Sequence, residues 1–102
     1  MGLLNRRTPS SSSEKIEKEL TILNRLGLHA RPAAMFVRVA SKHRCDIWVA
    51  KEDEEISGKS IMGLMMLAAG PGSKLTVSAE GQDASAALAE LETLIDRKFD
   101  EE

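Results

Sequence analysis

Apolar and polar side chains alternate at every second position in several short stretches of this chain. Such alternation is typical of a strand with one buried face. It predicts strands over residues 16–24 and 45–51, a short one around Ile56, and one over residues 74–80. In the second strand Ile47 and Val49 form the apolar face, so Trp48 is expected on the opposite face.

Elsewhere, apolar residues recur three or four positions apart, which is helical spacing. This predicts helices from His29 to about His43, over residues 61–69, and from Ala84 to Ile95. Ser60 and Asp83 precede the second and third helices and are residue types that favour helix starts. The order βαββαβα predicts an α+β sandwich, with three helices on one face of a four-stranded antiparallel sheet.

The second predicted helix is apolar on every side. Leu64 and Leu67 form one stripe, whereas Ile61, Met62 and Met65 fall on other faces. Full burial of a helix is hard to arrange in a small domain, so we expect the latter three side chains to form an exposed patch that docks onto partners. The alternative is that the methionines only fill the core.

Composition excludes several classes of function. The net charge is −2 and the only aromatic residues are one Trp and two Phe, which argues against a nucleic-acid partner. The single cysteine, Cys45, can form neither an internal disulfide nor a zinc site. The chain has no run resembling a signal peptide or a membrane span, so we expect a cytoplasmic protein with no membrane contact.

The two ends differ in composition from the middle. Residues 1–15 are rich in serine and poor in apolar side chains, which predicts a flexible N-terminal arm. Residues 100–102 are acidic and are expected to fray. The 102 residues therefore predict one folded domain over residues 16–99.

Three further features of the sequence are not assigned a catalytic or ligand-binding role. The acidic run over residues 52–55 is typical of a solvated hairpin, because consecutive carboxylates rarely converge on one metal ion. His43 lies near a helix end, where a solvated role is expected and no catalysis is assigned. The stretch Gly58-Lys59-Ser60 lacks the earlier glycine of a phosphate-binding loop, since that position is Asp53. No metal site and no cofactor is predicted.

The candidate chemistry lies at the start of the first helix, in residues 26–33. A helix start has unpaired backbone N–H groups and partial positive charge, and therefore attracts anions. His29 stands at that start and Arg31 follows, offering a nucleophilic imidazole and a planar cation. A histidine in this place is often only an indifferent cap. Together with Arg31, however, it suits a phosphoryl group carried on histidine.

The stretch Leu26-Gly27-Leu28-His29-Ala30-Arg31-Pro32-Ala33 resembles the active-site signature of the HPr family, the histidine phosphocarriers of the bacterial phosphotransferase system. A second stretch, Gly58-Lys59-Ser60-Ile61-Met62-Gly63-Leu64-Met65, resembles the family's regulatory-serine segment. The resemblance extends over about residues 16–99. It implies an HPr-like open-faced sandwich with strands in the order first, fourth, second, third.

The resemblance also implies a function. His29 would accept a phosphoryl group on Nδ1 from phosphoenolpyruvate through enzyme I and pass it to a histidine of an enzyme IIA. Arg31 would contact the phosphoryl oxygens, and the backbone N–H groups of Ala30 and Arg31 would cap them. The protein would be a stoichiometric carrier rather than an enzyme, and we expect it to act as a monomer.

Ser60 would be a site of regulatory phosphorylation by an HPr kinase/phosphorylase, if the host has one. A rival hypothesis is a regulatory adaptor in which phosphorylated Ser60 and the Ile/Met patch bind a regulator while His29 is idle. The sequence is compatible with both the sugar and the nitrogen branch of the system. Its end over residues 97–102 is similar to nitrogen-branch relatives, whereas the segment around Ser60 is closer to the sugar-branch form.

Overall fold

Four strands and three α-helices follow one another in the predicted order in the computed structural model, which describes residues 15–101. The elements are β1 (Lys15–Thr21), α1 (Ala30–Ser41), β2 (Asp46–Lys51), β3 (Glu54–Ser57), α2 (Ile61–Met66), β4 (Lys74–Glu80) and α3 (Ala84–Asp96), with a 3-10 turn over Lys98–Asp100. Lys15, assigned above to the arm, begins β1. The rest of the predicted arm, residues 1–14, lies outside the described residues.

The four strands form one antiparallel sheet in the order β1-β4-β2-β3. Its register brings apolar residues opposite one another on one face, as where Val49 faces Val77 on one side and Ile56 on the other. Trp48, between two core residues, is 37% exposed, which agrees with its predicted place on the opposite face. The α+β sandwich and its strand order are confirmed.

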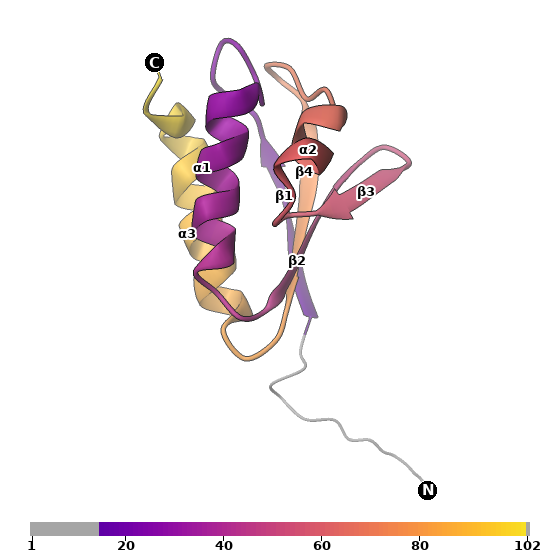
Figure 1. Cartoon of the computed structure of the whole chain (residues 1–102), viewed down its shortest axis with the longest axis vertical. Coiled ribbons are helices and arrows are strands. Elements are labelled where there is room, and N and C mark those ends of the chain that lie inside the picture. Colours follow the sequence, from indigo (N-terminus) through magenta and orange to yellow (C-terminus); the bar gives the residue numbers. More distant parts are fainter. Residues whose placement is uncertain (1–14, 102) are drawn as a thin grey trace, which may run out of the picture.

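The helices cover one face of the sheet, with α1 and α3 side by side (Figure 1). α1 packs against α3 and α2, and α3 packs against β1 and β4. Phe36 of α1 and Leu91 of α3 are fully buried in the shared core. No helix within residues 15–101 is both long and apolar enough to cross a membrane.

Several predicted boundaries are wrong. The first strand ends at Thr21 and not at residue 24, because the chain turns around the buried Asn24. α2 ends at Met66 and not at residue 69, since Ala68 adopts a left-handed backbone conformation with φ of 54°. Two residues expected to fray, Asp100 and Glu101, instead make side-chain contacts. Asp100 pairs with Arg97, and Glu101 makes side-chain contacts described below.

His43 is not the solvated residue that the sequence suggested. Its Nε2 lies 2.8 Å from Oε1 of Glu90 and its Nδ1 lies 3.4 Å from Oδ2 of Asp83, so the ring joins the end of α1 to α3. Asp83 occupies the N-cap position of α3 without a side-chain cap bond. Its carboxylate instead accepts hydrogen bonds from the backbone N–H groups of Arg44 and Cys45, at 2.9 Å each.

This arrangement perturbs two groups. The hydrogen bond from the backbone of Arg44, helped by those from Cys45, lowers the pKa of Asp83 to about 2. Burial, together with the neighbouring Asp83, raises the pKa of the Cys45 thiol to about 11. A thiol with a raised pKa is a poor nucleophile, so Cys45 serves packing and not chemistry.

Candidate functional site

The loop between β1 and α1 is held from inside the protein. The Asn24 side-chain amide donates to the carbonyl of Gly27 at 2.7 Å, and the N–H of Leu28 donates to the carbonyl of Ala69 at 2.8 Å. Gly27 has a φ of +71°, and a Cβ placed there would lie 2.4 Å from the Ala69 oxygen. Glycine is therefore required both by its backbone conformation and by the closeness of the neighbouring loop.

This loop places His29 at the N-cap of α1. Its backbone is extended, with φ of −80° and ψ of −169°, and its carbonyl accepts the N–H of Ala33 at 3.0 Å. Its side chain makes no cap hydrogen bond and is 38% exposed. The prediction that His29 stands at the helix start is confirmed, and its imidazole is partly exposed at the surface.

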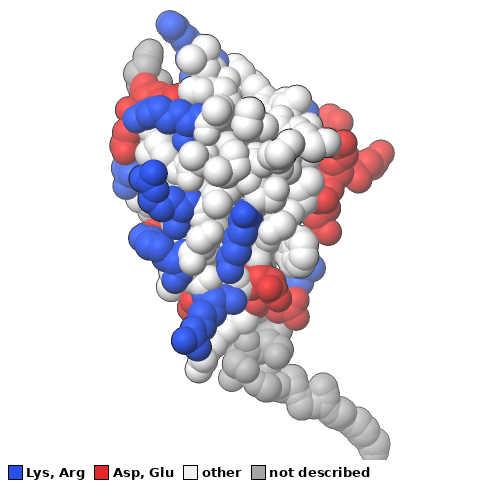
Figure 2. All heavy atoms as spheres, viewed as in Figure 1, with Lys and Arg blue, Asp and Glu red and all other residues white. Residues whose placement is uncertain are grey.

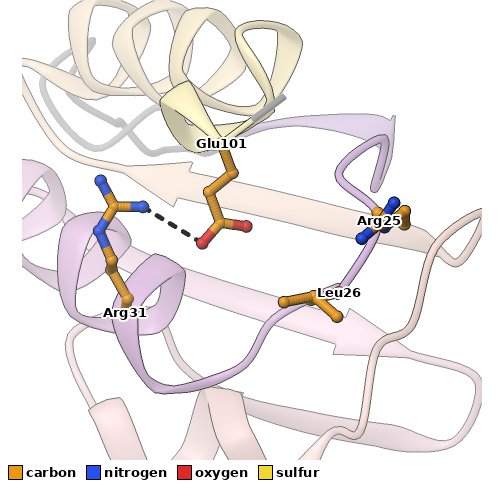
Figure 3. Close-up of a pocket in the computed structure, with 4 residues that line it drawn as sticks. All are labelled: Arg25, Leu26, Arg31 and Glu101. Carbon is orange, nitrogen blue, oxygen red and sulfur yellow. Dashed lines mark hydrogen bonds and ion pairs between the residues drawn. The ribbon is translucent and has the colours of Figure 1, made fainter.

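A carboxylate that sequence reasoning did not single out meets the histidine. Oε2 of Glu101 lies 2.8 Å from Nε2 of His29 and 3.2 Å from Nη1 of Arg31, while Oε1 accepts a hydrogen bond from Asn24 Nδ2 at 2.9 Å. Figure 3 shows Glu101 reaching from the C-terminal turn toward the guanidinium of Arg31. Residues from both ends of the domain thus form one cluster.

Glu101 is ionised in this cluster. Burial acts to raise the pKa of its carboxyl group, but hydrogen bonds from Asn24, His29 and Arg31 outweigh that effect and hold the pKa below its usual value. An ionised carboxylate can only accept hydrogen bonds. The short contact therefore assigns a proton to Nε2 of His29.

The other ring nitrogen is left for chemistry. Among residues 15–101 no hydrogen bond or ion pair involves Nδ1 of His29. A neutral imidazole protonated on Nε2 carries its lone pair on Nδ1, which makes that atom the nucleophile. The first backbone N–H groups of α1, those of Ala30 and Arg31, lack intrahelical acceptors and favour an anion nearby.

Two hollows flank the cluster. One, of about 300 Å³, is lined by Arg25, Leu26, Arg31 and Glu101. The other, of about 200 Å³, is lined by His29 together with Leu26, Leu28 and residues 68–70. Arg25, which lies across the first hollow from Arg31 (Figure 3), is a second cation that the sequence pattern did not identify. Both hollows lie next to the histidine loop.

An apolar surface adjoins the site. Ile61, Met62 and Met65 are exposed as predicted, with 72% exposure at Met62, so the alternative that the methionines only fill the core is wrong. Met66 of α2 and Leu26 of the histidine loop are also exposed, at 73% and 68%. Figure 2 shows few charged side chains between α1 and α2, whereas acidic ones gather over the β2–β3 hairpin.

Ser60 lies at the start of α2, beside the apolar surface. Its hydroxyl oxygen accepts the N–H of Gly63 at 2.9 Å, which confirms the predicted N-cap. The next residues, Ile61 and Met62, are exposed. A modification of Ser60 would therefore change the edge of this surface.

Known proteins resemble this chain over most of its length. A family model for the PTS HPr component phosphorylation site matches residues 16–97. The phosphocarrier protein HPr of Pseudomonas aeruginosa is 50% identical over 84 residues, which are 81% of this chain and 93% of that protein. The phosphocarrier protein NPr of Shewanella violacea is 42% identical over 87 residues, covering 85% and 96% of the two chains.

Solved structures agree with the sequence comparisons. The crystal structure of HPr-C-His from Thermoanaerobacter tengcongensis matches with a TM-score of 0.83 and 47% sequence identity, covering 85% of this chain and 98% of that one. The match includes the order of elements, with four antiparallel strands and three helices. By family model, sequence and fold, this chain belongs to the HPr family of phosphocarriers of the phosphotransferase system.

Proposed function

We propose that this protein accepts a phosphoryl group on Nδ1 of His29 from phosphoenolpyruvate through enzyme I and passes it to a histidine of an enzyme IIA. The observation that carries this proposal is the pairing of His29 Nε2 with Glu101 at 2.8 Å, beside a helix start. That pairing leaves Nδ1 as the nucleophilic nitrogen. The pairing with Glu101 also fixes the orientation of the ring. A histidine that served only as a helix cap would not require a fixed ring.

The transfer exchanges one bond to phosphorus for another. The Nδ1 lone pair of His29 forms a bond to phosphorus as the bond between phosphorus and its donor breaks, and the bonding electrons stay with the donor. Charge then lies on the phosphoryl oxygens. Passing the group to enzyme IIA repeats the exchange with Nδ1 as the leaving atom, so the carrier returns unchanged.

Arg31 and the start of α1 stabilise the phosphoryl group. The backbone N–H groups of Ala30 and Arg31 cap its oxygens, and the Arg31 guanidinium pairs with them. In the unphosphorylated structure that guanidinium lies 3.2 Å from Glu101. When the phosphoryl group arrives, the guanidinium must therefore either contact both anions or leave Glu101 for the phosphoryl oxygens. Exposed charges near a helix terminus contribute only about 0.3–1 kcal/mol each, which suits a carrier that must release its cargo.

The apolar surface serves as the docking site. Ile61, Met62 and Met65 of α2 and Leu26 of the histidine loop are exposed. α2 packs against α1, the helix that has His29 at its N-cap. Methionine side chains adapt to differently shaped partners, as a carrier that meets both enzyme I and enzyme IIA requires. Burial of these side chains would bring the phosphoryl donor or acceptor next to His29.

Ser60 is a second site of phosphorylation in this proposal. A phosphate on its hydroxyl would add about −1.5 to −2 charges at the edge of the docking surface. An HPr kinase/phosphorylase would be the modifying enzyme. The adaptor hypothesis, in which His29 is idle, is less well supported because the uncommitted Nδ1, Arg31 and the free helix start all lie at His29.

Incubation with enzyme I and phosphoenolpyruvate tests the proposal directly. The protein should gain one acid-labile phosphate, and His29→Ala should gain none. His43→Ala is the matched control, since it removes the other histidine and should still be phosphorylated. Phosphate on the His29→Ala variant, or none on the parent protein, would refute the assignment.

A further inference from the structure

A lysine occupies a core-facing position at the end of β2. Side chains alternate between the two faces of a strand, so Lys51 lies on the same face as the buried Ile47 and Val49. Lysine is rarely buried unless it has a partner. Lys51 is half-buried, and its Nζ donates hydrogen bonds to the carbonyl oxygens of Leu67 at 3.2 Å and Ala68 at 3.5 Å. Its ammonium group therefore binds the backbone where α2 ends.

The backbone at Ala68 is unfavourable. Its φ of 54° lies in the left-handed region, where Cβ approaches the following carbonyl oxygen, and a helix that ends in this way usually has glycine there. The residues on either side, Leu67 and Ala69, are buried, whereas Ala68 is exposed. The turn at Ala68 thus separates two buried neighbours. Strain of this kind persists only where surrounding contacts hold it.

The Lys51 ammonium provides such a contact. The last carbonyl groups of a helix have no intrahelical partner, and the helix dipole favours a cation beside them. The two carbonyls that Lys51 binds belong to the peptide groups on either side of the Ala68 Cα. The relative orientation of these two peptide groups is set by φ and ψ of Ala68. A cation that binds both carbonyls therefore stabilises this one backbone conformation.

The next carbonyl along the chain reaches the histidine loop. The oxygen of Ala69 accepts the N–H of Leu28, the residue before His29, at 2.8 Å. The histidine loop and the loop after α2 lie at the same end of the molecule (Figure 1). Residues 68–70 also line the hollow of about 200 Å³ together with His29. The conformation of Ala68 thus determines where the carbonyl that holds the histidine loop is directed.

We propose that Lys51 is a positioning residue for the histidine loop. By binding the carbonyls on both sides of the Ala68 Cα, its ammonium group stabilises the left-handed turn that directs the Ala69 oxygen at Leu28. The value of this contact for phosphoryl transfer rests on the function proposed above. The hydrogen bond from Leu28 to Ala69 belongs to the unphosphorylated protein and does not depend on that function.

The NMR scalar coupling across the hydrogen bond, from the Leu28 amide nitrogen to the Ala69 carbonyl carbon, tests the proposal in the folded protein. Lys51→Met keeps the unbranched apolar stem and removes the ammonium group. The coupling should fall to about half or less, because a hydrogen bond weakens steeply as its geometry departs from linear. The coupling from Gly72 to Ile22, at the far end of the same loop, should be unchanged and reports that the variant is folded. A parental Leu28 coupling in Lys51→Met would overturn the proposal.

A second substitution tests whether Lys51 acts through Ala68. Glycine adopts the left-handed conformation without the penalty that alanine pays, so Ala68→Gly should need no ammonium to hold the turn. We expect Ala68→Gly alone to keep the parental Leu28 coupling. Combined with Lys51→Met, it should restore most of the coupling that Lys51→Met loses. If the coupling stays low in the double variant, Lys51 does not act through the turn at Ala68 and the proposal fails.

Lys74→Met is the matched control. Lys74 is exposed at the start of β4, where the same loop ends, and its side chain has no hydrogen bond or ion pair within residues 15–101. The substitution makes the same change of charge and shape as Lys51→Met. The Leu28 coupling should equal that of the parent. A loss as large as in Lys51→Met would mean that the effect is one of general charge, which would contradict the proposal.

Transfer kinetics provide the second measurement. A positioning role predicts that Lys51→Met lowers kcat for phosphorylation by enzyme I about tenfold, because a small misplacement of a reacting group is costly. KM for the carrier should stay within experimental error, since Lys51 is not part of the docking surface, and Ala68→Gly should restore kcat. An effect confined to KM would contradict positioning. If the parent gains no phosphate, the proposed function fails, while the coupling still decides whether Lys51 holds the loop.

Discussion

The backbone N–H of Leu28 donates a hydrogen bond over 2.8 Å to the carbonyl oxygen of Ala69, which joins the histidine loop to the loop after α2. This contact brings the imidazole and the exposed side chains of α2 to the same end of the molecule. It is possible because Gly27, next to Leu28, has no Cβ that would meet the Ala69 oxygen. The proposed docking surface and the proposed phosphoryl-accepting atom are thus linked through a backbone hydrogen bond.

Gly27→Ala should destabilise the protein and slow phosphorylation. The alanine would have to adopt a φ of +71°, and its Cβ would lie 2.4 Å from the Ala69 oxygen. Gly72→Ala is the control, since Gly72 has a φ of +85° but open space around it. We expect Gly72→Ala to cost about 1 kcal/mol and Gly27→Ala about 3 kcal/mol in urea unfolding. Equal losses would mean that the closeness of Ala69 is unimportant.

Arg31→Lys should slow phosphoryl transfer although it keeps the positive charge. A lysine ammonium cannot reproduce the planar two-pronged contact of a guanidinium with phosphoryl oxygens. We expect a loss of about tenfold in rate, because a hydrogen bond to a charged group contributes roughly 1.5–3 kcal/mol. Arg25→Lys, in the same hollow, should have a smaller effect. An unchanged rate for Arg31→Lys would remove Arg31 from the mechanism.

Met62→Glu and Met65→Glu should weaken binding to enzyme I and enzyme IIA while leaving thermal stability nearly unchanged. Both side chains are exposed, so a carboxylate can replace them without burial, but it must lose water when a partner closes over the surface. Leu64→Ala is the contrasting control, because Leu64 is fully buried and its truncation should cost about 2–5 kcal/mol. Normal binding by both glutamate variants would contradict the docking surface.

Ser60→Asp should slow transfer from enzyme I, whereas Ser60→Ala should transfer at nearly the parental rate. Aspartate adds charge beside the exposed Ile61 and Met62, and it can still cap α2. Loss of the cap in Ser60→Ala should reduce stability by about 0.5–2 kcal/mol without unfolding the protein. Transfer rates and unfolding curves measured on the same preparations would separate the two effects. Equal rates would mean that Ser60 is only a helix cap.

Asp83→Asn should remove a contribution to stability that depends on pH. The folded-state pKa of Asp83 is lowered from 3.8 to about 2, so the ionised carboxylate stabilises the fold at pH values above 3.8. As the pH falls from 3.8 through 2, the carboxylate becomes protonated in the folded state and this contribution is lost. Denaturant unfolding at several pH values should show the parent and Asp83→Asn converging on acidification. A constant difference would contradict this role.

Local patterns were enough to predict much of this protein. The alternation of apolar residues in β4 and the helical spacing in α3 placed those elements well, because each depends on which face of a single element is buried. His29 at a helix start and Ser60 as a helix cap were predicted for the same reason, since both depend on residues within one turn. The residues at the helix start also suggested a phosphoryl group on His29, whereas the strand order, the phosphorylated atom and the partners came from resemblance to a family.

The tertiary structure decided which distant side chains meet. His29 and Glu101 are separated by 72 positions, and no periodicity relates them, so Glu101 was expected to fray, whereas its side chain in fact contacts His29. The contact depends on the buried Phe99 and on the left-handed backbone beside it, neither of which a local pattern reveals. His43 was likewise misjudged, because its carboxylate partners come from α3 and the turn before it. Sequence periodicity determines which face of an element is buried, whereas packing of the whole chain determines what that face and its neighbours contact.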